Sequence, residues 1–180
     1  SGVRQVQGTI NGLGERCGNA NLISVIPSLV LKESFSKSFE IGISKDKMKS
    51  LTECSRLLDE ILNRKSNRHS AYVGASAFAH KGGLHVSAVT KDPKTYEHVN
   101  PNTVGNFRNI VVSDQSGKSN IISRLKSIQI NIEENNPKVK KLLEEVKDRE
   151  FIGYSYDGAD ASFELLARRI IGEIPRYISI

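Results

Sequence analysis

A glycine-rich loop near the start of the chain joins an alternating segment to an apolar one, and this junction constrains the fold most strongly. Residues 3–10 alternate between apolar and polar side chains, a pattern typical of a β-strand. The loop at residues 11–18 is rich in glycine, and residues 19–31 then predict a helix that Pro27 limits or kinks. The order strand, loop, helix predicts an α/β protein.

The glycine loop fits neither of the common phosphate-binding fingerprints. A dinucleotide fingerprint needs its third glycine where Cys17 stands, and the carboxylate of Glu15 would repel a pyrophosphate. Residues 117–119 end like a Walker motif, but Val112 occupies the position of the required earlier glycine. The sequence therefore gives no support for nucleotide hydrolysis.

A second helix is predicted over residues 44–64. Its apolar side chains recur at three- and four-residue spacing, and Ser44 can cap its first turn. The polar segment 65–70 follows, and we place a domain boundary after residue 72. The side chains expected on the buried face of this helix are Met48, Leu51, Ser55, Leu58, Ile61 and Leu62.

The second half of the chain predicts a small mixed α/β module. Residues 109–113 predict a buried strand, and residues 119–126 a short helix. Pro137 can occupy the first turn of another helix, and Asp157 or Asp160 can start a last one. The expected inner positions of these two helices are Val139, Leu142, Leu143, Val146, Phe163, Leu166 and Ile170.

Charge and cysteine content restrict the class of protein. The net charge is +6, but the basic residues are spread along the chain among acidic ones, so we expect no nucleic-acid binding and keep it as the least favoured alternative. Cys17 and Cys54 lie outside any CxxC pair, which indicates reduced thiols. There is no run of eighteen apolar residues and no secretory leader. We therefore expect a cytoplasmic protein without membrane contact.

Both ends of the chain suggest a piece of a longer protein. The chain starts with Ser1 and enters directly into the strand-like residues 3–10, and residues 176–180 are also strand-like. We therefore expect the chain to continue in both directions.

Two groups of residues have the chemistry of a functional site. Glu15, Arg16 and Asn19 follow the predicted strand, at the end where barrels and open sheets place catalytic groups, although an ion pair that only holds the loop explains Glu15 and Arg16 equally well. His80 and His85 flank two glycines, and imidazole can transfer protons near neutral pH. Their five-residue spacing does not suit a metal site on one helix face.

These motifs resemble one known family. Residues 5–22, which include the sequence GERCGN, are similar to the last barrel strand and the following helix of the 2-isopropylmalate, homocitrate and citramalate synthases. Residues 77–85 resemble the start of the first linker subdomain of that family. Residues 104–105, together with 113–118, resemble the entry to the second linker subdomain. The likeness covers nearly the whole chain, in the same order.

The resemblance implies a domain plan. Residues 1–72 would be the last strand-helix unit of a TIM barrel, with the helices that follow it. Residues 73–104 would form the first linker subdomain, and residues 105–172, a mixed α/β segment, the second. Residues 173–180 would begin the connection to a regulatory domain.

The resemblance also implies an acyltransferase site. Asn19 matches the asparagine that binds a divalent metal ion (Mg, Mn or Zn) in the family, and Glu15 and Arg16 match the loop beside it. His85 and Tyr96 match the catalytic pair of the linker subdomain, which lies over acetyl-CoA, and His80 and Arg16 are the expected contacts to that cosubstrate. Most metal ligands of the family lie upstream of such a segment, so the chain alone is expected to be inactive.

Residues 86–88 read Val-Ser-Ala where isopropylmalate synthases usually have Gln-Asp-Gly. This resemblance to the citramalate synthases implies pyruvate as the 2-keto acid, (R)-citramalate as product, a role in isoleucine biosynthesis, and a homodimer. The alternatives are a 2-isopropylmalate synthase of leucine biosynthesis, which uses 2-ketoisovalerate, and a noncatalytic dimerisation or cap module.

Overall fold

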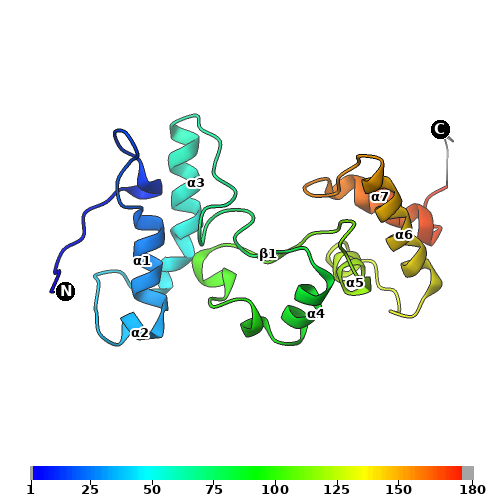
Figure 1. Ribbon diagram of the computed structural model, residues 1–180, viewed down its shortest axis with the longest axis horizontal. Helices are drawn as coiled ribbons and strands as arrows, with labels where there is room; N and C mark the ends of the chain where they lie inside the picture. The colour runs from blue at the N-terminus through cyan, green and yellow to red at the C-terminus, as the bar shows by residue number, and fades with distance from the viewer. Residues whose placement is uncertain (1, 176–180) are drawn as a thin grey trace. The chain divides into compact units, whose positions relative to one another are not determined.

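The computed structural model describes residues 2–175 and divides the chain into two compact units (Figure 1). Unit 1 comprises residues 1–78 and 97–109, and unit 2 comprises residues 79–96 and 110–180. The chain therefore passes from one unit to the other after residues 78, 96 and 109. Across residues 2–175, no helix is both long and apolar enough to cross a membrane.

Unit 1 consists of short helices around a small apolar core. Its elements are the 3-10 helix η1 (Ile10–Gly12), α1 (Leu22–Leu31), α2 (Glu33–Ser36), the 3-10 helix η2 (Lys45–Ser50), α3 (Leu51–Ile61) and the 3-10 helix η4 (Pro101–Val104). Its core consists of Ile23, Leu51, Tyr72, Val73, Phe78, Val99 and Val104. The buried amide of Asn106 donates to the carbonyl oxygens of Tyr72 (3.0 Å) and Gly74 (2.9 Å), which fixes residues 97–109 to this core.

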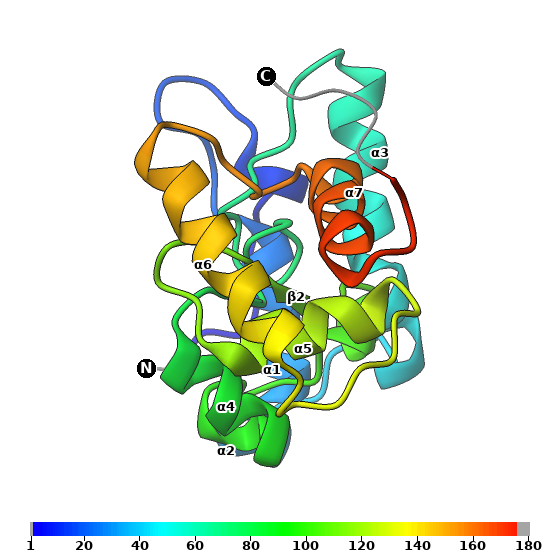
Figure 2. The same ribbon diagram turned by 90° about the vertical axis from the view of Figure 1, so that its right-hand side faces the viewer.

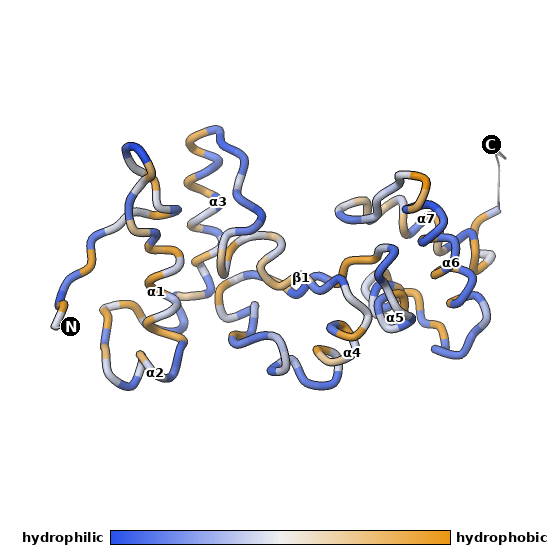
Figure 3. The backbone as a smooth tube through the Cα atoms, in the orientation of Figure 1, coloured by the Kyte–Doolittle hydropathy of each residue, from blue (hydrophilic) through white to orange (hydrophobic). Residues whose placement is uncertain are grey.

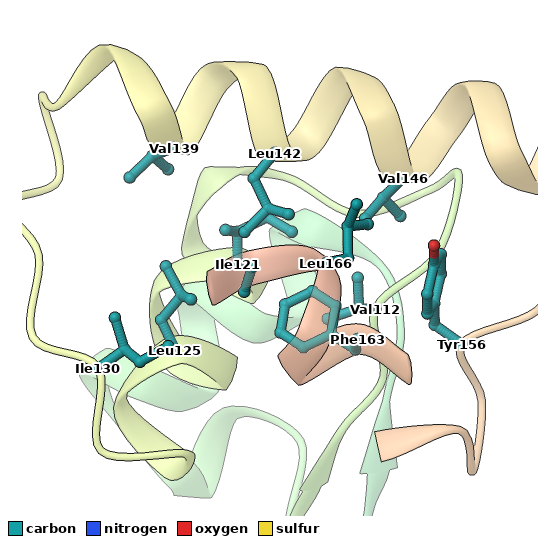
Figure 4. Close-up of a cluster of buried hydrophobic side chains, with 11 residues drawn as sticks. Val112, Ile121, Leu125, Ile130, Val139, Leu142, Val146, Tyr156, Phe163 and Leu166 are labelled. Atoms are coloured by element: carbon teal, nitrogen blue, oxygen red, sulfur yellow. The ribbon is translucent and has the colours of Figure 1, made fainter. Parts of the chain in front are cut away.

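Up to residue 175, unit 2 is built mainly from four helices. They are α4 (Gly83–Lys91), α5 (Lys118–Ser127), α6 (Pro137–Phe151) and α7 (Asp160–Ile171), with the 3-10 helix η3 (Pro93–Thr95) after α4. Helix α5 packs against both α4 and α6 (Figure 2). Phe163 of α7 is buried below α6, which directs Leu142 and Val146 toward it (Figure 4). Burial of these faces supplies most of the stability of such short helices.

Two short strands pair as a parallel sheet, β1 (Ala79–His80) with β2 (Asn109–Ile110). The amide of Asn109 donates to the carbonyl of Phe78, and the amide of Val111 donates to the carbonyl of His80, both at 3.0 Å. The strand predicted over residues 109–113 is therefore confirmed only at its beginning.

The predicted opening strand is wrong for the described residues. Residues 2–8 have no strand pairing, and Thr9 forms only an isolated parallel bridge with Asn21. A strand is stable only where a neighbouring strand accepts and donates its backbone hydrogen bonds. Most of residues 2–8 are accordingly exposed. The strand-like residues 176–180 lie outside the described part of the chain.

The predicted helix over residues 44–64 is partly confirmed. It begins as η2, the hydroxyl of Ser44 makes no capping hydrogen bond, and α3 ends at Ile61. Met48, Leu51 and Ser55 are buried, whereas Ile61 is 71% and Leu62 45% exposed, so the buried face stops before the last turn. In Figure 3 hydrophobic and hydrophilic positions alternate along α3, as the spacing predicts.

The other predicted helices are confirmed with small shifts in their ends. Helix α1 begins at Leu22 after an Asn21 cap, and Pro27 lies inside it without ending it. Pro137 is in the first turn of α6, and Asp160 begins α7. Of their expected inner positions, Val139, Leu142, Val146, Phe163 and Leu166 are buried, and Leu143 and Ile170 are partly buried.

Candidate functional site

Backbone hydrogen bonds close the glycine loop of unit 1 at its base. The amide of Thr9 donates to Ala20, and the amide of Leu22 donates back to the carbonyl of Thr9, both at 3.0 Å. The amide of Asn19 donates to the carbonyl of Gly12 at 2.9 Å. These bonds bring the two arms of the loop together and leave its tip, residues 14–20, exposed.

The side chain of Asn19 has a defined orientation in this loop. Its Nδ2 donates to the carbonyl oxygen of Leu13 at 2.9 Å, and the hydroxyl of Thr9 donates to the same oxygen at 2.6 Å. Among the described residues, none donates to Oδ1 of Asn19. The neutral amide oxygen, a ligand type that hard divalent cations accept, is therefore available to a ligand.

The structure places Glu15 and Arg16 together at the exposed tip of the loop. The backbone of Arg16 has φ of +55°, which turns the chain toward Gly18, and the amide of Gly18 donates to the carbonyl of Glu15 at 3.0 Å. In the described part of the chain, neither side chain forms an ion pair. The alternative in which an ion pair between Glu15 and Arg16 holds the loop is therefore wrong.

An asparagine that the sequence analysis missed fixes the loop to α3. Asn11 has φ of +59°, and its Nδ2 donates to the carbonyl of Ser55 at 2.9 Å and to Oδ1 of Asp59 at 3.1 Å. The hydroxyl of Ser55 donates to Oδ1 of Asn11 at 2.7 Å. Ser55 and Asp59 are buried, so the loop rests on a partly buried polar network. The local sequence hardly indicates the positive φ of Asn11, and its hydrogen-bond partners are distant in the sequence.

In unit 2, the three residues expected near acetyl-CoA lie together. The rings of His85 and Tyr96 have centroids 4.4 Å apart with their planes at 36°, and the ring of His80 is edge-on to Tyr96 at 6.4 Å. His85 and Tyr96 are exposed, and Tyr96 retains 51% of its accessible surface. The structure therefore brings these three rings into one cluster that faces solvent.

Both ends of this ring cluster are held by local structure. Helix α4 presents His85 from its first turn while Val86 and Val89 are buried beneath it. Tyr96 follows η3, which is capped by Asp92, whose carboxylate accepts the amide of Lys94 at 3.0 Å.

A second missed residue, Asn120, supports the start of α4 from within unit 2. It is fully buried, and its Nδ2 donates to the carbonyls of Lys81 (2.8 Å) and Val111 (3.1 Å). Its Oδ1 accepts the amide of Gly117 at 3.1 Å. A Cβ on Gly83 would lie 3.0 Å from the backbone nitrogen of Gly117, so the two chain segments touch closely. In the sequence, the one sign of this supporting role is that Asn120 stands three residues after Gly117, at the start of a predicted helix.

The residue after Tyr96 anchors the chain in unit 1. Arg108 donates from Nε and Nη2 to the two carboxylate oxygens of Glu97, at 2.7 and 2.6 Å. The carboxylate side chain is only 3% exposed, which strengthens these bonds. The hydrogen bond to Glu97 raises the pKa of Arg108 above its usual value, and desolvation opposes that rise. Glu97, the residue directly after Tyr96, is thus held in place by its side chain.

Only one side chain of this site, that of Asn19, is expected to be a metal ligand. No group of three or more His, Cys, Asp or Glu side chains with metal-binding geometry occurs among residues 2–175. Asn19 offers one oriented oxygen, and divalent cations need several ligands at once. The loop therefore fits a metal only as one contributor to a larger set. Cys17 and Cys54 are both free thiols.

Residues 72–151 match the family model described as the homocitrate synthase post-HMGL domain-like family. The chain is 48% identical over 179 residues to an (R)-citramalate synthase of Geobacter sulfurreducens, covering 99% of this chain and 33% of that protein. It is 50% identical over 177 residues to an (R)-citramalate synthase of Aquifex aeolicus, with 98% and 33% covered. A 2-isopropylmalate synthase of Sulfurisphaera tokodaii is 37% identical over 147 residues, with 82% and 36% covered.

The chain is similar to citramalate and 2-isopropylmalate synthases, and its residues 72–151 match the homocitrate synthase post-HMGL domain-like family. It is more similar to these (R)-citramalate synthases than to this 2-isopropylmalate synthase. It spans about a third of the length of the curated relatives that it matches.

Proposed function

We propose that the full-length protein carrying this chain is an acyltransferase that condenses acetyl-CoA with pyruvate, giving (R)-citramalate and CoA. The observation that carries the proposal is identity of 48–50% to (R)-citramalate synthases over 98–99% of the chain. The reaction would belong to branched-chain amino acid biosynthesis, on the isoleucine side. It would take place in the cytoplasm, where the thiols of Cys17 and Cys54 stay reduced.

The proposal assigns each part of the chain a place in the enzyme. Residues 1–72 supply the last strand-helix unit of a TIM barrel, in which residues 3–8 gain neighbouring strands. Residues 73–104 and 105–172 form the two linker subdomains, and residues 173–180 begin the connection to the next domain. Two such chains form a homodimer.

Asn19 is proposed to be one metal ligand, through the Oδ1 that its bond to Leu13 leaves available. A divalent cation bound there would polarise the carbonyl group of the 2-keto acid. Glu15 and Arg16 lie on the same exposed tip, where Arg16 can attract an anionic substrate and Glu15 can accept a proton or a hydrogen bond.

His85 and Tyr96 are proposed to act on the thioester. An N–H of His85 can donate to the thioester oxygen of acetyl-CoA and stabilise the negative charge that develops when a methyl proton is removed. Tyr96, whose ring lies against that of His85, orients the imidazole and can donate from its own hydroxyl. His80 packs edge-on against Tyr96 and is proposed to contact the cosubstrate.

Turnover of the full-length protein with two keto acids tests the substrate. We expect kcat/KM for pyruvate to exceed that for 2-ketoisovalerate by about 10- to 200-fold, because the branched substrate carries two extra methyl groups into a pocket sized for one. Release of CoA thiol measures both rates. Equal rates, or a preference for 2-ketoisovalerate, would support the 2-isopropylmalate synthase alternative, to which relatives of 37–38% identity point.

Substitution of His85 tests whether unit 2 is catalytic. We expect His85→Ala to lower kcat by roughly 10²- to 10⁴-fold, the usual contribution of a positioned proton-transfer group. The neighbouring Leu84→Ala is the matched control, because that side chain is 86% exposed. Light scattering checks that both variants keep the same oligomeric state. Normal turnover in the His85 variant would instead favour a noncatalytic dimerisation or cap module.

A further inference from the structure

Unit 1 contains a cavity of about 380 Å³ beside the base of the glycine loop. It lies between that loop, α3 and the segment that leads away from α3. Its walls include Asn11 and Asp59 together with the cationic residues Arg56, Arg64, Lys65 and Arg68. The size falls in the range of small-molecule sites, and every wall belongs to unit 1.

Positive charge dominates the walls of this cavity. Four of its lining side chains are cationic, and Asp59 is the one anionic wall residue. Asp59 is buried, at 8% exposure, and its carboxylate already accepts the amide of Asn11. Within the described chain, Arg56, Arg64 and Lys65 form no ion pair. No ion pair among the described residues therefore neutralises the charge of these three side chains.

The chemistry of the walls suits a phosphate group. Guanidinium groups present paired N–H donors that match two oxygens of a phosphate, and a lysine adds a compact charge. Ser66, Asn67 and Ser70 add neutral donors to the same walls. A dianion also offsets repulsion among three cations more fully than a single carboxylate would.

We propose that this cavity, with Arg56, Arg64 and Lys65, is a binding site for a phosphate group. This site is separate from the side-chain oxygen of Asn19. Leu13 is close to both, because its carbonyl oxygen accepts the Asn19 amide and the residue also lines the cavity. Two sources could supply the phosphate. One is free inorganic phosphate, and the other, which rests on the proposed function, is the phosphate-bearing end of CoA.

The test uses calorimetric titration of the full-length protein, with sodium chloride setting one fixed ionic strength. The probes are inorganic phosphate and adenosine 3′,5′-bisphosphate. We expect the double variant Arg64→Gln with Lys65→Gln to weaken phosphate binding at least about tenfold, since it removes two charge-assisted contacts. Lys45→Gln with Lys47→Gln is the matched control, because it removes the same charge from exposed positions of unit 1.

Each outcome decides the proposal. Phosphate binding by the wild type and the control, but not by the cavity variant, supports the site. Tighter bisphosphate binding, together with a raised KM for acetyl-CoA and unchanged kcat in the cavity variant, identifies CoA as the source; unchanged KM identifies free phosphate. Equal phosphate affinity in both double variants, or none in the wild type, overturns the site. If the full-length protein binds phosphate in this way but does not catalyse the condensation, the proposed function is wrong and the phosphate site stands.

Discussion

Gly14 is the residue whose lack of a side chain matters most to Asn19. A Cβ built on Gly14 would overlap Nδ2 of Asn19 and lie 2.9 Å from its Cγ. The Asn19 amide can therefore reach the carbonyl of Leu13 only because position 14 carries no side chain. Gly18 adds a second requirement, because its φ of +88° favours glycine.

Substitution of Gly14 is expected to weaken metal binding in the full-length protein. Gly14→Ala should displace the Asn19 side chain and lower the affinity for Mn²⁺ about 10- to 100-fold, as loss of a supporting contact to a metal ligand commonly does. Calorimetric titration measures the effect. Gly42→Ala is the control, since a Cβ there meets nothing within 4 Å. If both variants bind Mn²⁺ like the wild type, Asn19 is not a metal ligand held in this orientation.

At the same scale, the candidate site residues could be predicted from the sequence, but the residues that support them through hydrogen bonds could not. Glu15, Arg16 and Asn19 stand in a recognisable glycine loop. Asn11 and Asn120 resemble many surface asparagines in sequence, yet Asn11 bonds residues 44 and 48 positions away and Asn120 bonds a carbonyl 39 positions away. Such partners are created by tertiary folding, which no local pattern encodes.

At the scale of elements, the helices were predictable where the spacing of apolar residues marks the face that becomes buried. The apolar stripe of α6 runs from Val139 to Val146, about two turns of a helix that begins with a proline, and α7 repeats the pattern around Phe163. The opening strand failed because its stability depends on neighbours rather than on its own alternation. Within the described residues, a bridge at Thr9 is all the pairing that this segment has.

Helix α4 is one of the elements that the sequence analysis did not predict. It starts at Gly83 directly after Gly82, and glycine costs about 1 kcal/mol relative to alanine inside a helix. Packing offsets this weakness, because Val86 is fully buried and Asn120 bonds the backbone just before the helix. Helix α4 therefore forms through its contacts in unit 2, and His85 takes its position from that packing.

At the scale of the whole molecule, the proposed catalytic groups belong to two bodies. Asn19 is in unit 1 and His85 in unit 2, and each unit has its own apolar core. One active site can therefore combine the Asn19 of one subunit with the His85 of its partner if the protein is a symmetric dimer. We propose this exchange for the homodimer of the full-length protein.

Mixing two inactive variants tests whether the active site is shared between subunits. Asn19→Ala and His85→Ala homodimers should each be nearly inactive, and random re-association should restore about a quarter of the wild-type activity, because half the dimers are mixed and each holds one intact site of two. Turnover after mild dissociation and recombination measures the recovery, and recombined Asn19→Ala alone is the control. No recovery, with mixed dimers confirmed by differently tagged subunits, would place Asn19 and His85 of each site in the same chain.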